Sequence, residues 1–457
     1  MSFGKQQEDI RSIVSYRKRV IEVVRHYDVN QKTEISDRTG LAWPTVRYQI
    51  EKLQSQAIVE RGTDGKYNLN PKIAFFAGIS IGRKHTRLLI VDFQFKMVPF
   101  DKLFQQESVS EKTKKLFLET CGGNLSADGD YVSFPSPKNL LRATGMVDRF
   151  MDLIVALIKD GVPIYGVGLS LPVAFDKESG RTFGTVMMSG ISIDDLIYQD
   201  KLLFFRERNI PLVAEHGAKL VAIAEKEYLY LRQDPNMSKG HIAVVYLGSD
   251  IGVGLILNHQ LHRGSGGMSG TIGHLPNIPA MAPEITDTYF MSLTPVAAVD
   301  TLEITDADAP VMCDVCQKDN CLTARLKQCG AYDIISEGSG ELSNEAMWGL
   351  FVYLGRIIGT LTVLDLDLII LSGKAATLDP DAKIWRNLNI LLMEYSESHT
   401  SRSTRIIKTP VLIPHTAVGA AINAYYAWVD DEPKQPEPYE KINTSPVVKW
   451  LDFEQGS

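Results

Sequence analysis

The chain has 457 residues, of which 44% are hydrophobic and 23% charged, and its formal net charge is −7. This composition is typical of a soluble globular protein and excludes collagen, coiled-coil and disordered classes; at roughly 150 residues per domain, the length allows about three domains. No stretch reaches the roughly 20 consecutive apolar residues of a membrane span, and the N-terminus lacks the pattern of a secretory signal. We therefore expect a cytoplasmic protein without a membrane partner.

Charge is distributed unevenly along the chain. Residues 1–75 hold 13 Lys and Arg against 9 Asp and Glu, whereas the remainder holds 35 against 46. A small basic module on a large acidic body indicates a nucleic-acid reader joined to a sensor or an enzyme.

Apolar spacing predicts a helix at the start of the basic module. Val20, Val23, Val24 and Tyr27 fall at i, i+3, i+4 and i+7, which is the pattern of one buried helix face.

A short second helix is expected to follow. Thr33 can cap it, Arg38 is its expected end, and Gly40 can terminate it in a left-handed conformation while Leu41 fills the turn.

A third helix is expected from residue 44 to residue 54. Pro44 suits its first turn, and Val46, Ile50 and Leu53 repeat as its buried seam. Two short helices joined by a tight turn are typical of a helix-turn-helix whose second helix enters the major groove of double-stranded DNA.

Residues 57–69 read as two short strands around a Gly/Asp turn, which predicts a wing beside the third helix. An alternative is a three-helix protein-interaction module whose charges are merely solvated. The residues expected to contact DNA are Thr33, Trp43, Pro44, Thr45, Arg47, Tyr48, Lys52, Arg61 and Lys66.

The body alternates apolar strands with helices, which predicts an α/β fold with mainly buried strands. Its first element is a glycine-centred hairpin at residues 76–92, a shape that can cradle a phosphate. Further strands are expected at 164–173, 211–214, 242–247 and 368–371, and helices at 218–228 and 418–428.

Three clustered cysteines indicate a metal site. Cys313, Cys316 and Cys321 form a C-x2-C-x4-C pattern, close enough for three thiolates to bind one tetrahedral ion. Such bunching in a long chain favours a reducing compartment and structural Zn²⁺ over disulfides. The isolated Cys121 is expected to be a free thiol.

The order of these motifs resembles the ROK family (repressors, open reading frames and kinases), and the resemblance covers nearly the whole chain. Any one glycine motif is weakly specific, but the set in family order is strong. The matching pieces are the N-terminal module, the segments 78–86, 168–173, 215–225, 248–254 and 270–274, and the cysteine cluster.

The resemblance implies a mainly α, winged helix-turn-helix domain followed by an α/β, two-lobed body with the actin- and hexokinase-like ATPase fold. We expect the DNA-binding domain at 1–72, the ROK-type body at 73–429 and an acidic, Pro-containing tail at 430–457. Within the body, lobe one is expected at about 73–190 plus the C-terminal helix, lobe two at about 191–415, and a zinc loop at 274–329.

The departures from the family pattern argue against catalysis. Kinases of this family carry Asp-x-Gly-Gly-Thr in the first hairpin, where this chain has Ser80, Gly82 and Arg83. Gly217 stands where those kinases have the aspartate that acts as general base. Since a general base contributes on the order of 10² to 10⁴ in rate, no catalytic residue is assigned.

The resemblance also implies an effector pocket and a zinc ligand. His216, Thr271 and His274 occupy the positions of sugar contacts, and Thr323 replaces a further glutamate of the family. A sugar or sugar phosphate is the expected effector class, with a different effector, or none, as alternatives. His274 is expected to complete the zinc site with Cys313, Cys316 and Cys321, unless Cys329 or another histidine takes that place.

Together these observations predict a DNA-binding transcriptional regulator, a repressor of carbohydrate-related genes. It would bind a pseudo-palindromic operator as a homodimer or homotetramer. The alternatives are a ROK-family sugar kinase that phosphorylates a hexose or amino sugar with ATP, and a metal-stabilised scaffold for protein partners.

Overall fold

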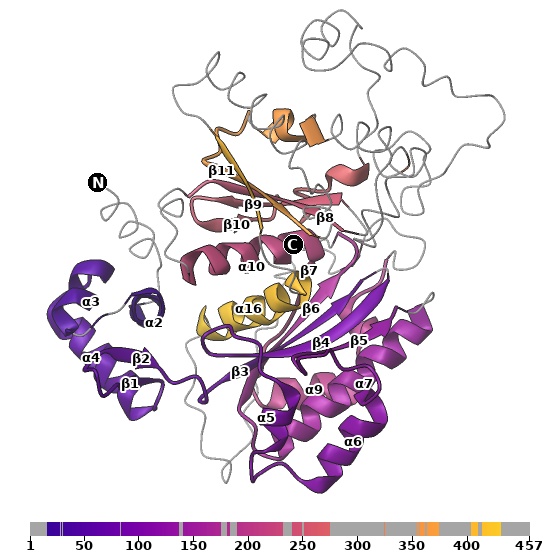
Figure 1. The fold of residues 1–457 in the computed structure, drawn as a ribbon, viewed down its shortest axis with the longest axis horizontal. Coiled ribbons are helices and arrows are strands. Elements are labelled where there is room, and N and C mark those ends of the chain that lie inside the picture. The colour runs from indigo at the N-terminus through magenta and orange to yellow at the C-terminus, as the bar shows by residue number, and fades with distance from the viewer. Residues whose placement is uncertain are drawn as a thin grey trace, which may run out of the picture.

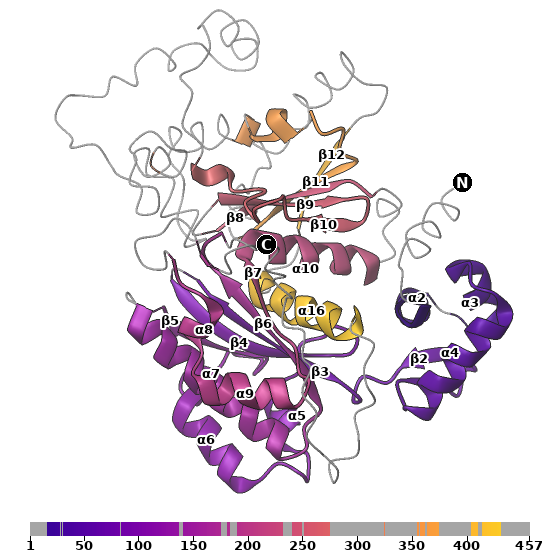
Figure 2. The same cartoon turned by 180° about the vertical axis from the view of Figure 1, so that it is seen from behind.

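The computed structural model describes residues 16–27, 29, 31–82, 84–136, 140–174, 181–182, 190–231, 240–248, 251–274, 324, 354–355, 357–361, 363–373, 404–409 and 414–430. These residues form an N-terminal module (residues 16–69) beside a larger body built on two five-stranded sheets (Figure 1, Figure 2). This is the predicted winged helix-turn-helix and two-lobed α/β architecture. None of the described helices is long and apolar enough to cross a membrane.

Three helices begin the N-terminal module: α2 (Tyr16–His26), α3 (Lys32–Thr39) and α4 (Trp43–Ser55). The apolar seam predicted for α4 is buried, and so are Val20, Val23 and Val24 of α2, because together they form the core of the module. Tyr27 lies just past the end of α2 and is half-buried. Pro44 lies in the first turn of α4, as predicted.

The ends of α3 agree only in part with the sequence prediction. Gly40 terminates the helix with φ 67°, and Leu41 is buried in the turn, as expected. Thr33 is not the cap, which is a correction. The helix begins earlier, because the backbone N–H of Gln31 donates to the Glu34 carboxylate at 3.3 Å and sets the first turn there.

The wing is confirmed as an antiparallel pair of strands, β1 (Val59–Arg61) and β2 (Tyr67–Leu69). Gly65 supplies the positive φ of 79° that the turn between them requires.

The first sheet of the body has the order β5-β4-β3-β6-β7. The predicted hairpin is its antiparallel pair β3–β4, and β6 runs parallel to both β3 and β7. Helices α5 to α9 cover one face and bury a large apolar core there (Figure 1). The strands are β3 (Phe75–Ile81), β4 (His85–Asp92), β5 (Tyr131–Pro135), β6 (Ile164–Leu171) and β7 (Leu212–His216), and the helices are α5 (Phe100–Phe104), α6 (Glu111–Cys121), α7 (Leu140–Lys159), α8 (Ile193–Leu196) and α9 (Gln199–Glu207).

Two expectations about this lobe are corrected. The lobe extends past the boundary expected near residue 190, because β7 pairs with β6 and completes its sheet. Residues 104–140 show no clear apolar period, which predicts extended strands and a surface insertion, but they also contain helix α6. Ser110 caps that helix by accepting from the Thr113 backbone N–H. Phe117 and Cys121 of that helix are buried in the core.

The second sheet has the order β10-β9-β8-β11-β12. Strands β8, β9 and β10 are antiparallel neighbours, whereas β11 runs parallel to β8 and β12. Two helices, α10 (Gly217–Leu231) and α16 (His415–Asp430), lie between the two sheets (Figure 1, Figure 2). The strands are β8 (Ile242–Leu247), β9 (Ile251–Leu257), β10 (Gln260–His262), β11 (Leu368–Ser372) and β12 (Arg405–Lys408), with a short 3-10 helix, η2 (Ile272–His274).

Several motif glycines serve close packing. A Cβ at Gly168 would lie 1.9 Å from the Ala420 carbonyl oxygen, so glycine lets α16 lie directly on β6. Likewise, a Cβ at Gly254 would lie 2.4 Å from the Ala222 Cβ of α10. The family-like segment 248–254 is therefore partly strand, because residues 251–254 belong to β9.

Candidate nucleic-acid interface and interlobe cleft

One face of α4 is exposed and carries aromatic and basic side chains. Trp43 is 45% exposed and Tyr48 60%, and the Arg47 side chain is 63% exposed. They point away from the core because Val46 and Ile50 occupy the buried positions between them.

Glu51 pairs with two of the basic side chains on this face. Its Oε1 accepts a hydrogen bond from Arg47 Nε at 2.8 Å and lies 3.4 Å from Lys32 Nζ. The hydrogen bond from Arg47 lowers the pKa of the Glu51 carboxyl. The Lys52 ammonium lies 5.9 Å from the centre of the Tyr48 ring. Two cations from α3 and α4 thus share one carboxylate.

The wing adds a further basic group. Arg61 Nε donates to the Gly65 carbonyl at 3.1 Å, and its guanidinium lies 5.7 Å from the Tyr67 ring. Of the nine residues predicted to contact DNA, two are half-buried, Thr45 and Lys66. The others are exposed: Thr33, Trp43, Pro44, Arg47, Tyr48, Lys52 and Arg61.

A cleft lies between the two lobes. It is basic, because Lys84 and Arg87 line it together with His85 and His216, while none of the described lining residues carries a carboxylate. The lining residues are Ser80, Ile81, Gly82, Lys84, His85, Arg87, Ser170, Leu171, Pro172, His216, Gly217, Ala218, Tyr246, Gly248, Gly252 and Thr416.

Gly217 opens α10 at the floor of this cleft. A Cβ there would lie 3.4 Å from Ser170 Oγ and 3.5 Å from Thr416 Cγ2, which are ordinary contacts. Packing therefore does not demand glycine at this position. The described cleft holds no carboxylate that could accept a hydroxyl proton as a general base.

The other predicted effector and metal residues are not brought together by the described part of the chain. Thr271 is not among the lining residues and donates its hydroxyl to the Met268 carbonyl at 2.8 Å. His274 belongs to η2, but its side chain lies outside the described residues, as does Arg83. Cys313, Cys316, Cys321, Thr323 and Cys329, most of the expected zinc loop, and residues 431–457 of the tail also lie outside them.

A buried glutamate next to the cleft was missed by the sequence reasoning. Glu215 accepts a hydrogen bond from Arg263 Nε at 2.7 Å and lies 3.6 Å from Lys219 Nζ. Burial alone would raise the pKa of Glu215, but Lys219 and Arg263 hold it below its ordinary value. This ionised group ties β7 to the start of α10 and to residue 263.

A second missed feature joins the N-terminal module to the body. Arg25 of α2 donates to the Phe93 carbonyl at 2.7 Å, and the Tyr425 hydroxyl of α16 donates to Glu22 at 2.7 Å. One signal for this contact was available in the sequence, because Ile21 places an apolar side chain on a second side of α2, outside the predicted seam. In the structure Ile21 is fully buried.

The comparisons with known proteins agree with this architecture. Residues 203–422 match the model of the family described as the ROK family. A xylose repressor from Bacillus subtilis is 22% identical over 265 residues, 56% of this chain and 58% of that relative. A glucokinase from Halalkalibacterium halodurans is 22% identical over 179 residues, 39% of this chain and 51% of that relative.

A solved structure shares the fold. It is described as a ROK family transcriptional regulator, a homolog of the E. coli MLC protein. It superposes with a TM-score of 0.53 at 12% identity, covering 93% of this chain and 97% of that chain. The chain spans little more than half the length of the curated relatives it matches.

Proposed function

The chain contains a ROK family domain, and from this premise we propose that it is a DNA-binding transcriptional repressor of carbohydrate-related genes. The observation that carries the proposal is the exposed face of α4, where Trp43, Arg47 and Tyr48 stand beside a wing that carries Arg61 and Lys66. The similarity to xylose repressors supports the same role.

In this proposal α4 enters the major groove and the wing contacts the sugar-phosphate backbone of the DNA. Arg47 is suited to guanine or phosphate, whereas Arg61 and Lys66 fix the register through phosphates. Because recognition helices of a dimer must reach successive major-groove faces, the operator would be a pseudo-palindrome with half-sites about 34 Å apart. The protein would act as a homodimer or homotetramer.

The interlobe cleft would hold the effector. Its basic lining, which includes Lys84 and Arg87 with no carboxylate among the described lining residues, favours an anionic ligand. A sugar phosphate fits that chemistry better than a neutral sugar. The two lobes would adopt a more open and a more closed arrangement, and each arrangement would set a different spacing of the two α4 helices in the dimer. An effector that binds one arrangement more tightly would increase its population and so change the affinity for DNA.

DNA binding is tested by capturing genomic fragments on the full-length protein at a stated salt concentration, since phosphate contacts make affinity salt-dependent. We expect enrichment of an inverted repeat. Arg47→Ala should weaken operator binding by about tenfold to a hundredfold, and Tyr48→Ala should also weaken it, both without changing oligomeric state. Lys115→Ala, which removes an exposed cation from α6 of the body, is the matched control. Equal binding by Arg47→Ala and Lys115→Ala would refute the assignment of α4.

Kinase activity is the second candidate, favoured by the basic cleft, which also suits the phosphates of a nucleotide. We propose that the chain is not an enzyme, because Gly217 offers no proton acceptor. ATP-dependent phosphorylation of any hexose or amino sugar by the parent protein would overturn this. Gly217→Asp is the matched variant, because the space around residue 217 accepts a side chain. Activity in that variant alone would show that the missing carboxylate is the cause.

We further propose a structural Zn²⁺ held by His274, Cys313, Cys316 and Cys321. The support is the donor set, because three closely spaced thiolates and an imidazole are typical ligands of closed, four-coordinate zinc. The test is the zinc content of the purified protein. Cys313→Ser and Cys316→Ser should each lose the ion, and unchanged zinc content in both would refute the ligand assignment.

A further inference from the structure

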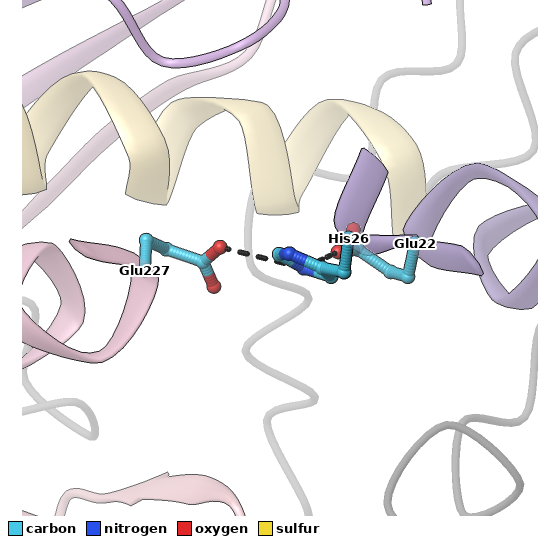
Figure 3. A group of neighbouring side chains, drawn as sticks. All are labelled: Glu22, His26 and Glu227. Atoms are coloured by element: carbon cyan, nitrogen blue, oxygen red, sulfur yellow. Dashed lines mark hydrogen bonds and ion pairs between the residues drawn. The ribbon is translucent and has the colours of Figure 1, made fainter. Parts of the chain in front are cut away.

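Three potential metal ligands from two domains converge in the interior of the protein. Glu22 and His26 lie one turn apart on α2 of the N-terminal module, and Glu227 projects toward them from α10 of the body (Figure 3). All three side chains are buried, with at most 8% of each exposed. No motif of the sequence analysis includes them.

The distances suit a shared ion. Nε2 of His26 lies 2.9 Å from Oε2 of Glu22 and 3.8 Å from Oε2 of Glu227, and the three ligand atoms all lie within 4.8 Å of one another. Metal–ligand bonds of about 2.0–2.2 Å set tetrahedral ligand atoms about 3.4 Å apart. Small side-chain rotations would therefore bring the three atoms into a coordination sphere.

Tyrosine hydroxyls orient both carboxylates. Tyr425 donates to Oε1 of Glu22 at 2.7 Å, and Tyr426 donates to Oε1 of Glu227. Each carboxylate therefore keeps its other oxygen toward His26. Oε2 of Glu227 is fully buried and accepts no hydrogen bond from the described residues. Hydrogen bonds to the outer oxygens of ligating carboxylates are the usual support of a metal site.

Glu22 adds negative charge to this buried cluster. Burial alone would raise the pKa of Glu22, but Arg25, His26 and Tyr425 hold it well below its usual range, so this group is a carboxylate. The Arg25 guanidinium lies 3.8 Å from Glu22 and balances one negative charge.

We propose that Nε2 of His26 and one carboxylate oxygen each of Glu22 and Glu227 bind a divalent transition-metal ion, Zn²⁺ or Mn²⁺. The ion joins α2 to α10 and so fixes the N-terminal module against the body. Its binding does not depend on the proposed DNA recognition, and it is separate from the expected cysteine site.

Binding is measured by titrating Mn²⁺ into the chelator-treated full-length protein without DNA, with free Mn²⁺ read by electron paramagnetic resonance. Mn²⁺ is the probe because it prefers carboxylate oxygen ligands over the thiolates of the cysteine site. We expect a saturable site that Zn²⁺ displaces. Glu227→Gln and His26→Gln should each weaken binding at least tenfold, and Tyr426→Phe about 10- to 100-fold.

Glu225→Gln is the matched control. Glu225 forms a second buried pair with a histidine, His415, at 3.1 Å, and Ser372 and Thr409 donate to it. That pair has a single carboxylate, so we expect parental Mn²⁺ affinity in this variant. Circular dichroism shows that each variant is folded.

Amide hydrogen exchange tests the link without any variant. Mn²⁺ should slow exchange in α2 of the parent protein, because the ion ties that helix to α10. The proposal is overturned if α2 exchanges equally fast with and without Mn²⁺. It is also overturned if the parent binds no more Mn²⁺ than Glu227→Gln.

Discussion

Replacing Arg25 by methionine tests whether the contact between the N-terminal module and the body depends on a buried cation. The Arg25 side chain is 1% exposed. It donates to the Phe93 carbonyl at 2.7 Å, and its guanidinium lies 3.8 Å from the Phe95 ring and 4.4 Å from the Tyr425 ring. Methionine keeps much of the apolar length but removes the charge and the donor.

The expected cost follows from what the substitution leaves behind. Glu22 loses its nearby cation, and the Phe93 carbonyl loses its donor, both inside the protein. Removing one partner of a buried ion pair typically costs about 3–5 kcal/mol. The substitution also removes cation–π contacts, but the energies of neighbouring interactions of one side chain are not fully additive, so these contacts do not add their full energy to that cost. We therefore expect a loss of about 3–5 kcal/mol in the free energy of unfolding.

The assay is urea denaturation of the full-length protein, followed by tryptophan fluorescence, because Trp428 packs against Phe93 and Phe76 in this region. Arg47→Met is the matched control, since it removes the same group from an exposed position of the same module. We expect the control to leave the unfolding midpoint unchanged while weakening operator binding. A loss below about 1 kcal/mol for Arg25→Met, or equal losses for both variants, would refute the reasoning.

Three other predictions concern single residues. The pKa of Glu22 is lowered in the folded state. Its contribution to stability is therefore complete above about pH 5 and is lost as the pH falls through that lowered pKa. The free energy of unfolding, measured by denaturation, should fall less steeply in acid for Glu22→Gln than for the parent. Burial raises the pKa of the Cys121 thiol to about 12, so mapping by mass spectrometry should find Cys121 unmodified by thiol reagents at pH 8 in the native protein, and rapid labelling would contradict its burial. Gly168→Ala should destabilise the protein by about 3 kcal/mol, because its Cβ would lie 1.9 Å from the Ala420 carbonyl oxygen. Gly145→Ala, whose Cβ meets nothing within 4 Å, is the control and should not destabilise it.

The helices and strands of the chain were largely predictable because their signals are local. The seam of Val46, Ile50 and Leu53 predicted α4, and the apolar run from 242 to 247 matches β8. Thr33 was assigned wrongly as the cap because both Gln31 and Thr33 are able to start a helix. The hydrogen bond from the Gln31 backbone N–H to the Glu34 carboxylate decides between them.

Features that depend on distant residues could not be read from local patterns. The pairing of β7 with β6 places residues 212–216 in the first sheet, and nothing in the β7 sequence specifies that neighbour. The cluster of Glu22, His26 and Glu227 joins residues about 200 positions apart, so their convergence requires the folded arrangement of α2 and α10. The exposed face of α4 was predictable, because surface residues follow directly from the buried seam.

The hydrogen bond between Tyr425 and Glu22 spans 403 positions of the chain. During synthesis at about 5–20 residues per second, the partner helix α16 emerges from the ribosome roughly 20–80 seconds after α2. For that time the face of α2 that later contacts α16 has no partner from that helix, so it must stay in water without aggregating. Glu22, Arg25 and His26 make this face charged and polar, so we expect it to aggregate less readily than an apolar face would before α16 is available.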